Sequence, residues 1–581
     1  MGDVKNLISA VVLSMLVLFA YQTFYLTPLE EEAAQQALLE AETLGEETLA
    51  LGDTTIPDPD ADSLSAPEVQ APVVETTTTQ PVKRVAINAA RLKGSISPVG
   101  ARLDDLVLND YYDRLGDGAQ NIELLKNETA SNAYFAEFNW RANTGVILPT
   151  SQTVWTTRGG PLTTDGEVEL YWENGQGITF RQFISIDENF MFTIRQVVEN
   201  NSSQRINIAP IGEVRRIDTP DIQGFFILYE GPLGVFNGTL EDGDDYDDLA
   251  DDGPVDFTVS PNGWLGYTDK YWLTALVPDQ TRPFTARFQH QKILGRDAYL
   301  IRYLVDQGEV VAIGGSSEYV THFFAGAKEV SLIDAYEETY NIPLFDRAID
   351  WGWFYFLTKP IFYTLDYFYV LLGNFGVSIL ILTVIIKLFL FPLANKSFRA
   401  MSKVKKLQPK IMAIKERFPD DKMRQQQETM ALYKREKANP ASGCLPIFIQ
   451  IPVFFALYKT LFVTIEMRHE PFFGWVHDLA APDPMTVITL FGLVPWDAPG
   501  FLLVGIWPIL MGVTMWFQMK LNPQSPDPIQ AKIFTYMPIV FTFILAPFPV
   551  GLVIYWTWNN LLTILQQYVI MRKEGVPIGH G

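Results

Sequence analysis

A single lysine inside an otherwise apolar run constrains this chain most strongly. Residues 377–393 have the sequence VSILILTVIIKLFLFPL, in which Lys387 is the only charge and Thr383 lies one helical turn earlier on the same face. A charged side chain at that depth in a bilayer costs at least about 2.5–3.5 kcal/mol, so such residues usually face a helix bundle or a water-filled space. The pattern indicates a membrane-spanning helix with a functional polar face.

Charged and apolar residues are segregated along the chain. Its 581 residues are 48% hydrophobic, yet the net charge is −23. Residues 26–82 contain thirteen Asp or Glu and no Lys or Arg, whereas residues 397–439 are strongly basic. This distribution is typical of a membrane protein with one large soluble part. Because residues 26–82 lack an apolar repeat, we expect them to form a disordered acidic linker.

Several stretches approach the roughly 20 residues that a helix needs to cross a bilayer. We predict six spans, at residues 7–25, 377–393, 445–465, 501–519, 533–548 and 550–570. The first has no clear cleavage site after it, so we expect residues 1–25 to be an uncleaved anchor, with a signal peptide as the alternative. The other five would form the helical core, with spans three to six within residues 445–570.

Basic residues predict the orientation. Thirteen Lys or Arg lie between residues 396 and 437, whereas Arg468 is the only one between the third and fourth predicted spans. The positive-inside rule places the basic segment 396–440 in the cytoplasm. Both termini, including the short tail 571–581, would then be cytoplasmic, and residues 26–346 would lie outside. Lys459, near the outer end of the third span, is expected to reach the headgroups.

Residues 83–346 have the alternation of apolar and polar side chains that β-strands require. Clear examples are residues 177–186 and 190–198, joined across Asp187, and similar strands are expected at 225–228, 264–277 and 298–304. No long helical pattern intervenes, so we predict a large antiparallel β-sandwich. The acidic residues 241–252 lack the order of a calcium-binding loop and are predicted to be a solvated loop.

Two further segments have helical composition. Residues 350–376 are rich in aromatic side chains and predict an amphipathic helix in the outer interface, or else the start of a longer tilted span. Residues 397–418 and 421–439 predict a basic helical hairpin, with Asp420 or Asp421 capping its second helix. Its charge either forms a docking surface or only fixes topology, and the candidate docking residues are Lys403, Lys405, Lys406, Lys410, Lys415 and Arg417.

Polar residues recur within the predicted spans. No Asp or Glu within a span can pair with Lys387, so hydration is the simplest way to keep its charge there. We therefore expect a water-filled groove open to the cytoplasm, the alternative being a Lys387 that reaches the inner headgroups. Other polar positions on the sixth span are Thr557 and Thr563. The candidate groove residues are Lys387, Thr383, Gln450, Thr514, Gln518, Tyr555, Trp556, Asn559 and Asn560.

Composition excludes several kinds of site. Cys444 is the only cysteine, and the five histidines are not spaced as zinc ligands, so we expect no disulfide framework and no metal. No GxxxxGK[ST] pattern is present, so no nucleotide cofactor is expected.

Several long strings give the chain a family resemblance. They include GNFGVSILILTVIIKLFLFPL, FFGWVHDLAAPDP and FPVGLVIYWTWNNLLTILQQYVI. They resemble the bacterial YidC insertases of the YidC/Oxa/Alb family, over nearly the whole chain from residue 83. The resemblance implies a non-enzymatic insertase and chaperone of the inner membrane. It also implies several partners: nascent membrane proteins, the Sec translocon, membrane lipid, and the ribosome, which the hairpin would contact. It implies no partner with a specific nucleic-acid sequence.

Two positions depart from the family pattern. Where the family usually has arginine in its groove, this chain has Lys387, which keeps the charge but loses the forked geometry. Where a tyrosine is common on the sixth span, this chain has Trp556 beside Tyr555.

Two other classes of function compete with the insertase. A transporter would use the same polar residues, but no repeated half is visible. An enzyme would need acid and base groups in the β domain, where His290 and His322 are the only histidines.

Overall fold

The computed structural model describes residues 82–143, 145–222, 228–419, 421–438, 445–490, 503–521 and 528–575. All of them belong to one compact unit, Pro81–Gly581. The predicted anchor, nearly all of the acidic linker, Cys444 and residues 225–227 of one predicted strand lie outside the described residues.

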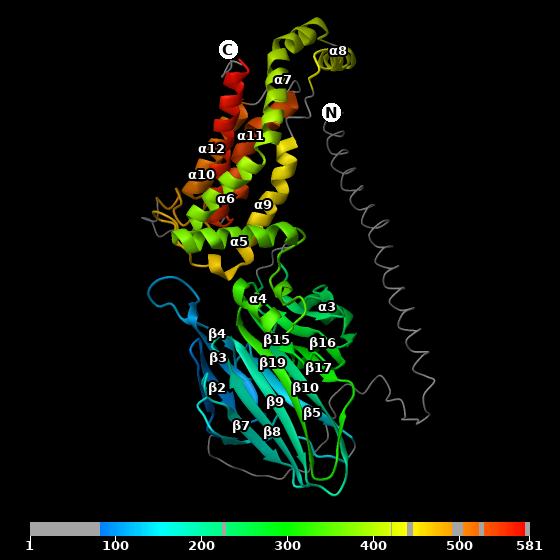
Figure 1. Ribbon diagram of the computed structural model, residues 1–581. Coiled ribbons are helices and arrows are strands. Elements are labelled where there is room, and N and C mark those ends of the chain that lie inside the picture. Colours follow the sequence, from blue (N-terminus) through cyan, green and yellow to red (C-terminus); the bar gives the residue numbers. More distant parts are fainter. Residues whose placement is uncertain are drawn as a thin grey trace, which may run out of the picture. The chain divides into compact units, whose positions relative to one another are not determined.

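Two antiparallel sheets make up the described part of residues 83–327 (Figure 1). The first has the order β1 (Val85–Asn88), β2 (Leu92–Ser97), β3 (Arg102–Tyr112), β5 (Tyr134–Ala142), β10 (Ile206–Ile217), β17 (Arg296–Val305), β16 (Phe284–Ile293) and β13 (Val255–Val259). Beside this path, β4 (Asn121–Leu125) pairs with β3 and β18 (Glu309–Val311) pairs with β10. The second has the order β12 (Thr239–Glu241), β11 (Gly231–Phe236), β14 (Trp264–Thr268), β15 (Trp272–Val277), β19 (Gly315–Ala327), β9 (Met191–Asn200), β8 (Ile178–Ile186), β7 (Val168–Glu173) and β6 (Thr156–Arg158).

The period-two pattern explains the sandwich. Along β8 buried and half-buried residues alternate without a break, as the sequence predicted. The turn into β9 is fixed by the Asp187 carboxylate, which accepts the backbone N–H groups of Asn189 and Met191. Phe138 and Phe323, one from each sheet, meet edge to face with ring centroids 5.9 Å apart. The predicted β-sandwich is confirmed.

Two sequence-based expectations for this domain are wrong in detail. Residues 264–277 form two strands, β14 and β15, because the chain turns between Thr268 and Leu273, which face each other in the ladder. The acidic loop 241–252 contains a short helix, α3 (Tyr246–Asp252), whose N-terminus is capped by Asp245. Burial of Tyr246 and Leu249 stabilises that helix and explains why an acidic segment is ordered.

The remaining described chain is helical. Its elements are α4 (Val330–Thr339), η2 (Phe345–Ala348), α5 (Tyr355–Leu372), α6 (Phe375–Phe389), α7 (Phe391–Arg417), α8 (Lys422–Arg435), α9 (Leu445–Val463), η4 (Ile465–Met467), α10 (Ile506–Leu521), α11 (Pro528–Ile544) and α12 (Val550–Lys573). Helix α12 contacts α6, α7, α9 and α10, so it lies at the centre of the bundle, and α5 packs against α6 and α9 (Figure 1).

The predicted span 377–393 is not one straight helix. Helix α6 ends at Phe389 and α7 begins at Phe391, with a bend of 67° between them. Pro392 sits in the first turn of α7; it has no N–H to donate to the carbonyl of Leu388 in α6, and its ring clashes with that carbonyl. The apolar sequence 377–393 therefore continues across a break in the helix that Pro392 causes.

Of the helices in the described ranges, only the bent pair α6 and α7, taken together, has the length and apolar composition of a membrane span. Gln450–Val463 and Phe534–Ile544 are shorter apolar helices. The six spans therefore remain a sequence-based prediction.

The aromatic segment 350–376 contains a separate helix, α5, which is shorter than the predicted segment and ends before α6 begins. Helix α5 ends at Gly373, which adopts a left-handed conformation with φ of 68°. Asn374 then caps α6 by accepting the N–H of Val377. Trp353 before α5, and Phe356 and Val370 within it, are largely exposed, which agrees with an amphipathic helix.

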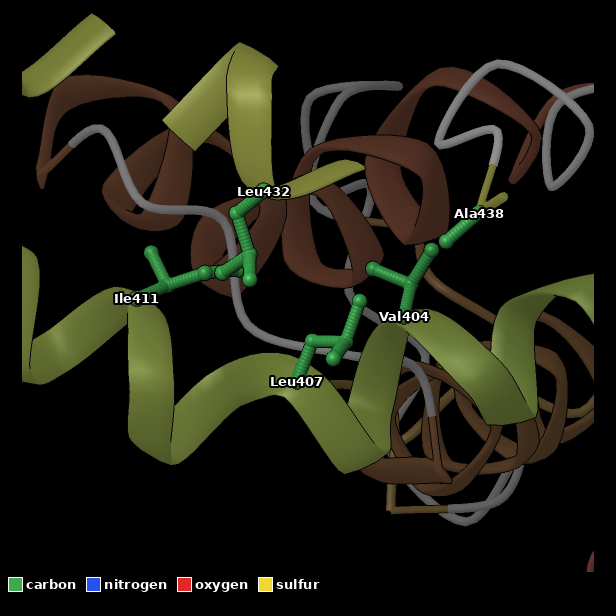
Figure 2. Close-up of a cluster of buried hydrophobic side chains, with 5 residues drawn as sticks. All are labelled: Val404, Leu407, Ile411, Leu432 and Ala438. Carbon is green, nitrogen blue, oxygen red and sulfur yellow. The ribbon is translucent and has the colours of Figure 1, made fainter. Parts of the chain in front are cut away.

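The predicted helical hairpin is present as α7 and α8, and Asp421 caps α8 by accepting the N–H of Arg424. Figure 2 shows the small apolar core that joins the two helices. It consists of Val404, Leu407, Ile411, Leu432 and Ala438.

Polar contacts join the β domain to the helices. Lys459 on α9 forms an ion pair of 2.7 Å with Asp350, so the expectation that Lys459 reaches the headgroups is wrong. The same Asp350 carboxylate accepts the N–H of Tyr229 from the β domain. Beyond the end of α9, the Glu466 carboxyl accepts the N–H of Val330 at the start of α4, at 2.7 Å.

Candidate functional site

Helix α12 carries several buried polar side chains. Tyr555, Asn559 and Thr563 recur every four residues and therefore share one helical face. Together with Asn560 they are buried, each 9% exposed or less. We call these four residues and their partners on the neighbouring helices the polar belt; the partners are Lys387 on α6, Gln450 on α9 and Thr514 on α10.

Lys387 meets the belt through Thr563. Its ammonium donates a hydrogen bond of 2.7 Å to the Thr563 hydroxyl, which in turn donates to the backbone carbonyl of Asn559. No ion pair of Lys387 occurs among the described residues, so its charge meets a neutral oxygen. A hydroxyl orients an ammonium group without neutralising its charge.

Two more hydrogen bonds connect α12 to its neighbours. The Gln450 side-chain amide donates to the Tyr555 hydroxyl. The Asn560 amide donates to the Thr514 hydroxyl at 3.2 Å. The polar belt therefore links α6, α9 and α10 through a single central helix.

The other predicted groove residues lie nearby but are not linked in this way. Thr383 is buried, and its hydroxyl bonds the carbonyl of Ile379 in its own helix. Gln518 is half-buried one turn after Thr514 on α10. Trp556 packs edge to face on Phe454, with ring centroids 4.5 Å apart, and borders an apolar cluster of α10, α11 and α12.

Thr563 is not among the groove residues predicted from the sequence, although its position on the sixth predicted span is noted as polar. The sequence signal that could have identified Thr563 as a groove residue is its spacing of four residues from Asn559, which places both on one helix face. Its contact with Lys387 depends on how α6 and α12 pack, which the sequence of either helix alone does not specify.

Three of the predicted docking residues on the hairpin form hydrogen bonds to other parts of the chain. Lys405, Lys406 and Lys410 contact other parts of the chain: the carbonyl oxygens of Leu521 and Glu574 and the carboxylate of Glu436, respectively. Lys403 and Arg417 are exposed, and Lys415 is half-buried.

The β-domain histidines have structural partners. His322 bonds the Thr193 hydroxyl at 3.1 Å and packs on Tyr340, and burial lowers its pKa. His290 lies 2.7 Å from the Asp297 carboxylate. Over the ranges that the structure describes, no group of three or more His, Cys, Asp and Glu could hold a metal ion.

Comparisons with known proteins cover both regions. Residues 84–364 match the family described as the YidC periplasmic domain, and residues 367–575 match the 60Kd inner membrane protein family. The membrane protein insertase YidC of Methylobacterium nodulans is 46% identical over 586 residues, covering 99% of this chain and 96% of that protein. The same protein of Bradyrhizobium diazoefficiens is 46% identical over 604 residues, covering 100% and 97%.

A crystal structure of an active YidC insertase with its first transmembrane domain resolved is also similar. It is 18% identical, with a TM-score of 0.36, and the match covers 84% of this chain and 93% of that one.

These matches define a class: a bacterial inner membrane protein with a periplasmic β-sandwich and a C-terminal helical region. Within that class, the chain belongs to the YidC family of membrane protein insertases.

Proposed function

We propose that this chain inserts nascent membrane proteins into the bacterial inner membrane and that its polar belt contacts them during insertion. The hydrogen bond between Lys387 and Thr563 carries the proposal, because it holds a positive charge beside a polar face that spans several helices. The similarity to proteins named as insertases supports the same conclusion.

The proposed chemistry is non-covalent. A hydrated groove, open to the cytoplasm and containing the polar belt, would lower the cost of moving a hydrophilic segment across. The positive charge of Lys387 would attract acidic residues of that segment. Apolar side chains exposed on α6, such as Leu388 and Phe389, would then favour release of the client helix into lipid.

Magnitudes indicate how such a groove can work without nucleotide hydrolysis. A charged residue at the bilayer centre costs about 2.5–3.5 kcal/mol on insertion scales. A membrane potential of about 100 mV, positive outside, contributes roughly 2.3 kcal/mol per negative charge moved outward. An acidic tail therefore needs only modest help, which a hydrated lysine can supply.

Topology and partners follow from the sequence and from the family. We propose six spans with both termini in the cytoplasm, cooperation with the Sec translocon on larger clients, and ribosome contact through the hairpin. Arg417, exposed on α7, remains accessible for such contact. Family membership favours this function over a solute transporter, and we assign no catalytic residue.

Reconstitution tests the proposal. Purified protein in liposomes should protect a single-span client with an acidic tail from external protease. Lys387→Arg should retain insertion, since it keeps the charge, and Lys387→Met should lose most of it. Equal insertion by all three proteins would show that the charge of Lys387 is not needed for insertion. If the unmodified protein inserted nothing, the proposal that it can insert clients on its own would be contradicted.

A further inference from the structure

Two adjacent lysines of α7 contact the ends of two different bundle helices. The Lys405 ammonium lies 3.4 Å from the carbonyl oxygen of Leu521, the last residue of α10. The Lys406 ammonium donates a bond of 2.5 Å to the carbonyl oxygen of Glu574, which closes α12. Arg399, two turns earlier, lies 3.4 Å from the Glu574 carboxylate.

These contacts match the chemistry of a helix C-terminus. The last carbonyl groups of a helix have no partner within it and carry partial negative charge. A lysine from another helix can satisfy them, as Lys405 and Lys406 do from one turn of α7. The two bonds therefore connect adjacent residues of α7 to the end of α10 and to the end of α12.

The two helices held in this way are those joined within the polar belt. Asn560 of α12 donates to Thr514 of α10, about four turns before the end of α12 and about two turns before the end of α10. A change in the separation of the ends would change the separation at the belt, because helices transmit such displacements as nearly rigid rods.

We propose that Lys405 and Lys406 are positioning residues for insertion, which fix the separation of α10 and α12 at the polar belt. The inference rests on the proposed function and deepens it. It reassigns two lysines that sequence analysis grouped with the docking residues. Lys403 supplies the matched control, because it lies on the same helix, is exposed and carries the same charge.

The first experiment measures insertion without ribosomes. Liposomes would contain the unmodified protein, a Lys405→Met/Lys406→Met double variant, a Lys405→Arg/Lys406→Arg double variant, or Lys403→Met. We expect insertion of a purified single-span client to fall at least fivefold in the methionine double variant. The arginine double variant and Lys403→Met should stay within twofold of the unmodified protein, because the first keeps both donors and the second leaves them intact.

The second experiment measures the helix separation itself. Spin labels at Trp516→Cys on α10 and Leu565→Cys on α12, both exposed positions, report this distance in a Cys444→Ser background. The methionine double variant should give a longer or broader distance distribution, and Lys403→Met should not.

Three results would overturn the inference: full insertion by the methionine double variant, an equal loss in Lys403→Met, or a loss of insertion with unchanged distances. Failure of the unmodified protein to insert the client would instead contradict the proposed function, and the spin-label distances would still decide the role of the two lysines.

Discussion

At the scale of single residues, the contact between Lys387 and Thr563 is the most informative one. A hydrogen bond to a charged group contributes about 1.5–3 kcal/mol, which is enough to fix the direction of a lysine side chain. Thr563 accepts from the ammonium and donates to its own helix, so both capacities of its hydroxyl are used. The Thr563 hydroxyl therefore orients the ammonium group of Lys387.

Replacing Thr563 by valine should therefore impair insertion. The Thr563→Val variant keeps the shape of the side chain but removes the acceptor of Lys387, and we expect roughly a tenfold loss in insertion of an acidic-tail client, corresponding to about 1.4 kcal/mol. Thr557→Val is the control, since Thr557 is also buried on α12 and bonds only the carbonyl of Val553 among its described contacts. A similar loss in both variants would assign the effect to α12 as a whole.

A second residue-scale prediction concerns pH. Burial is the main cause of a pKa of about 8 for Glu466; the nearby carboxylates of Glu329 and Asp366 add to the shift, and the backbone N–H groups of Val330 and Glu466 oppose it. An unfolded glutamic acid has a pKa of about 4.3. Between these two values the folded protein holds a proton that the unfolded chain has released, so stability falls as pH rises.

The Glu466→Gln variant should remove the pH-dependent contribution of Glu466 to stability. The unmodified protein should lose up to about 1.4 kcal/mol of stability per pH unit relative to the variant, between about pH 5 and about pH 8. Unfolding of both proteins in detergent across that window measures the difference. Parallel pH profiles would show that the Glu466 carboxyl does not titrate between the two states.

At the scale of elements, sequence patterns predicted structure where one period dominated. Strand β8 was recognisable because its apolar and polar residues alternate over its whole length. The capped hairpin α7–α8 was recognisable because Asp421 follows the break at Pro419. The division of 264–277 was missed because all of β14 and most of β15 are buried, which removes the alternation that would mark a turn.

The candidate site was predictable only in part. Lys387 stands out because an isolated charge in an apolar run has few inexpensive environments. Its partner was not identified, because Thr557, Asn559, Asn560 and Thr563 all lie on α12 and only helix packing selects among them. Trp556 packs its ring against an apolar cluster, whereas its neighbour Tyr555 has a polar partner, and a client contact at Trp556 stays a prediction.

The hairpin core allows a prediction for one element. Leu407 and Leu432 are both less than 8% exposed and meet between α7 and α8 (Figure 2). Leu407→Ala should cost about 2–5 kcal/mol locally, since it leaves a cavity in a core of few residues. We expect faster protease cleavage within α8, with the β domain still protected. Met423→Ala, at a position 69% exposed, should leave the cleavage rate unchanged, and equal acceleration would exclude the proposed packing.

At the scale of the whole molecule, a few polar contacts connect the periplasmic domain to the helices. Asp350 joins Lys459 of α9 to the backbone of Tyr229 in the β domain, and Glu466 joins the end of α9 to α4. Because these contacts are buried or half-buried, salt should screen them less than surface ion pairs. The two regions are thus connected by directional bonds as well as by the chain.

Breaking one of these contacts tests their importance. Lys459→Met leaves the Asp350 carboxylate without its cation and should destabilise the protein by about 1–3 kcal/mol. The double variant Lys459→Met/Asp350→Asn should recover part of that loss, because no unpaired charge remains. Thermal unfolding of four proteins in detergent, namely the unmodified protein, Lys459→Met, Asp350→Asn and the double variant, gives the coupling energy. Strict additivity of the two single substitutions would mean that the pair contributes nothing to stability.

The central claim is that clients contact the polar belt as they enter the membrane, and site-specific photo-crosslinking tests it most directly. A photoreactive residue at Asn560, in the belt, would be compared with one at Leu565, which is 60% exposed on α12. The client would be a ribosome-bound chain halted with its acidic tail partly inserted. The account predicts that position 560 crosslinks to the acidic tail of the client. It predicts that position 565 crosslinks only to the apolar segment of the client, or to neither. Crosslinks to the tail from position 565 alone would contradict it.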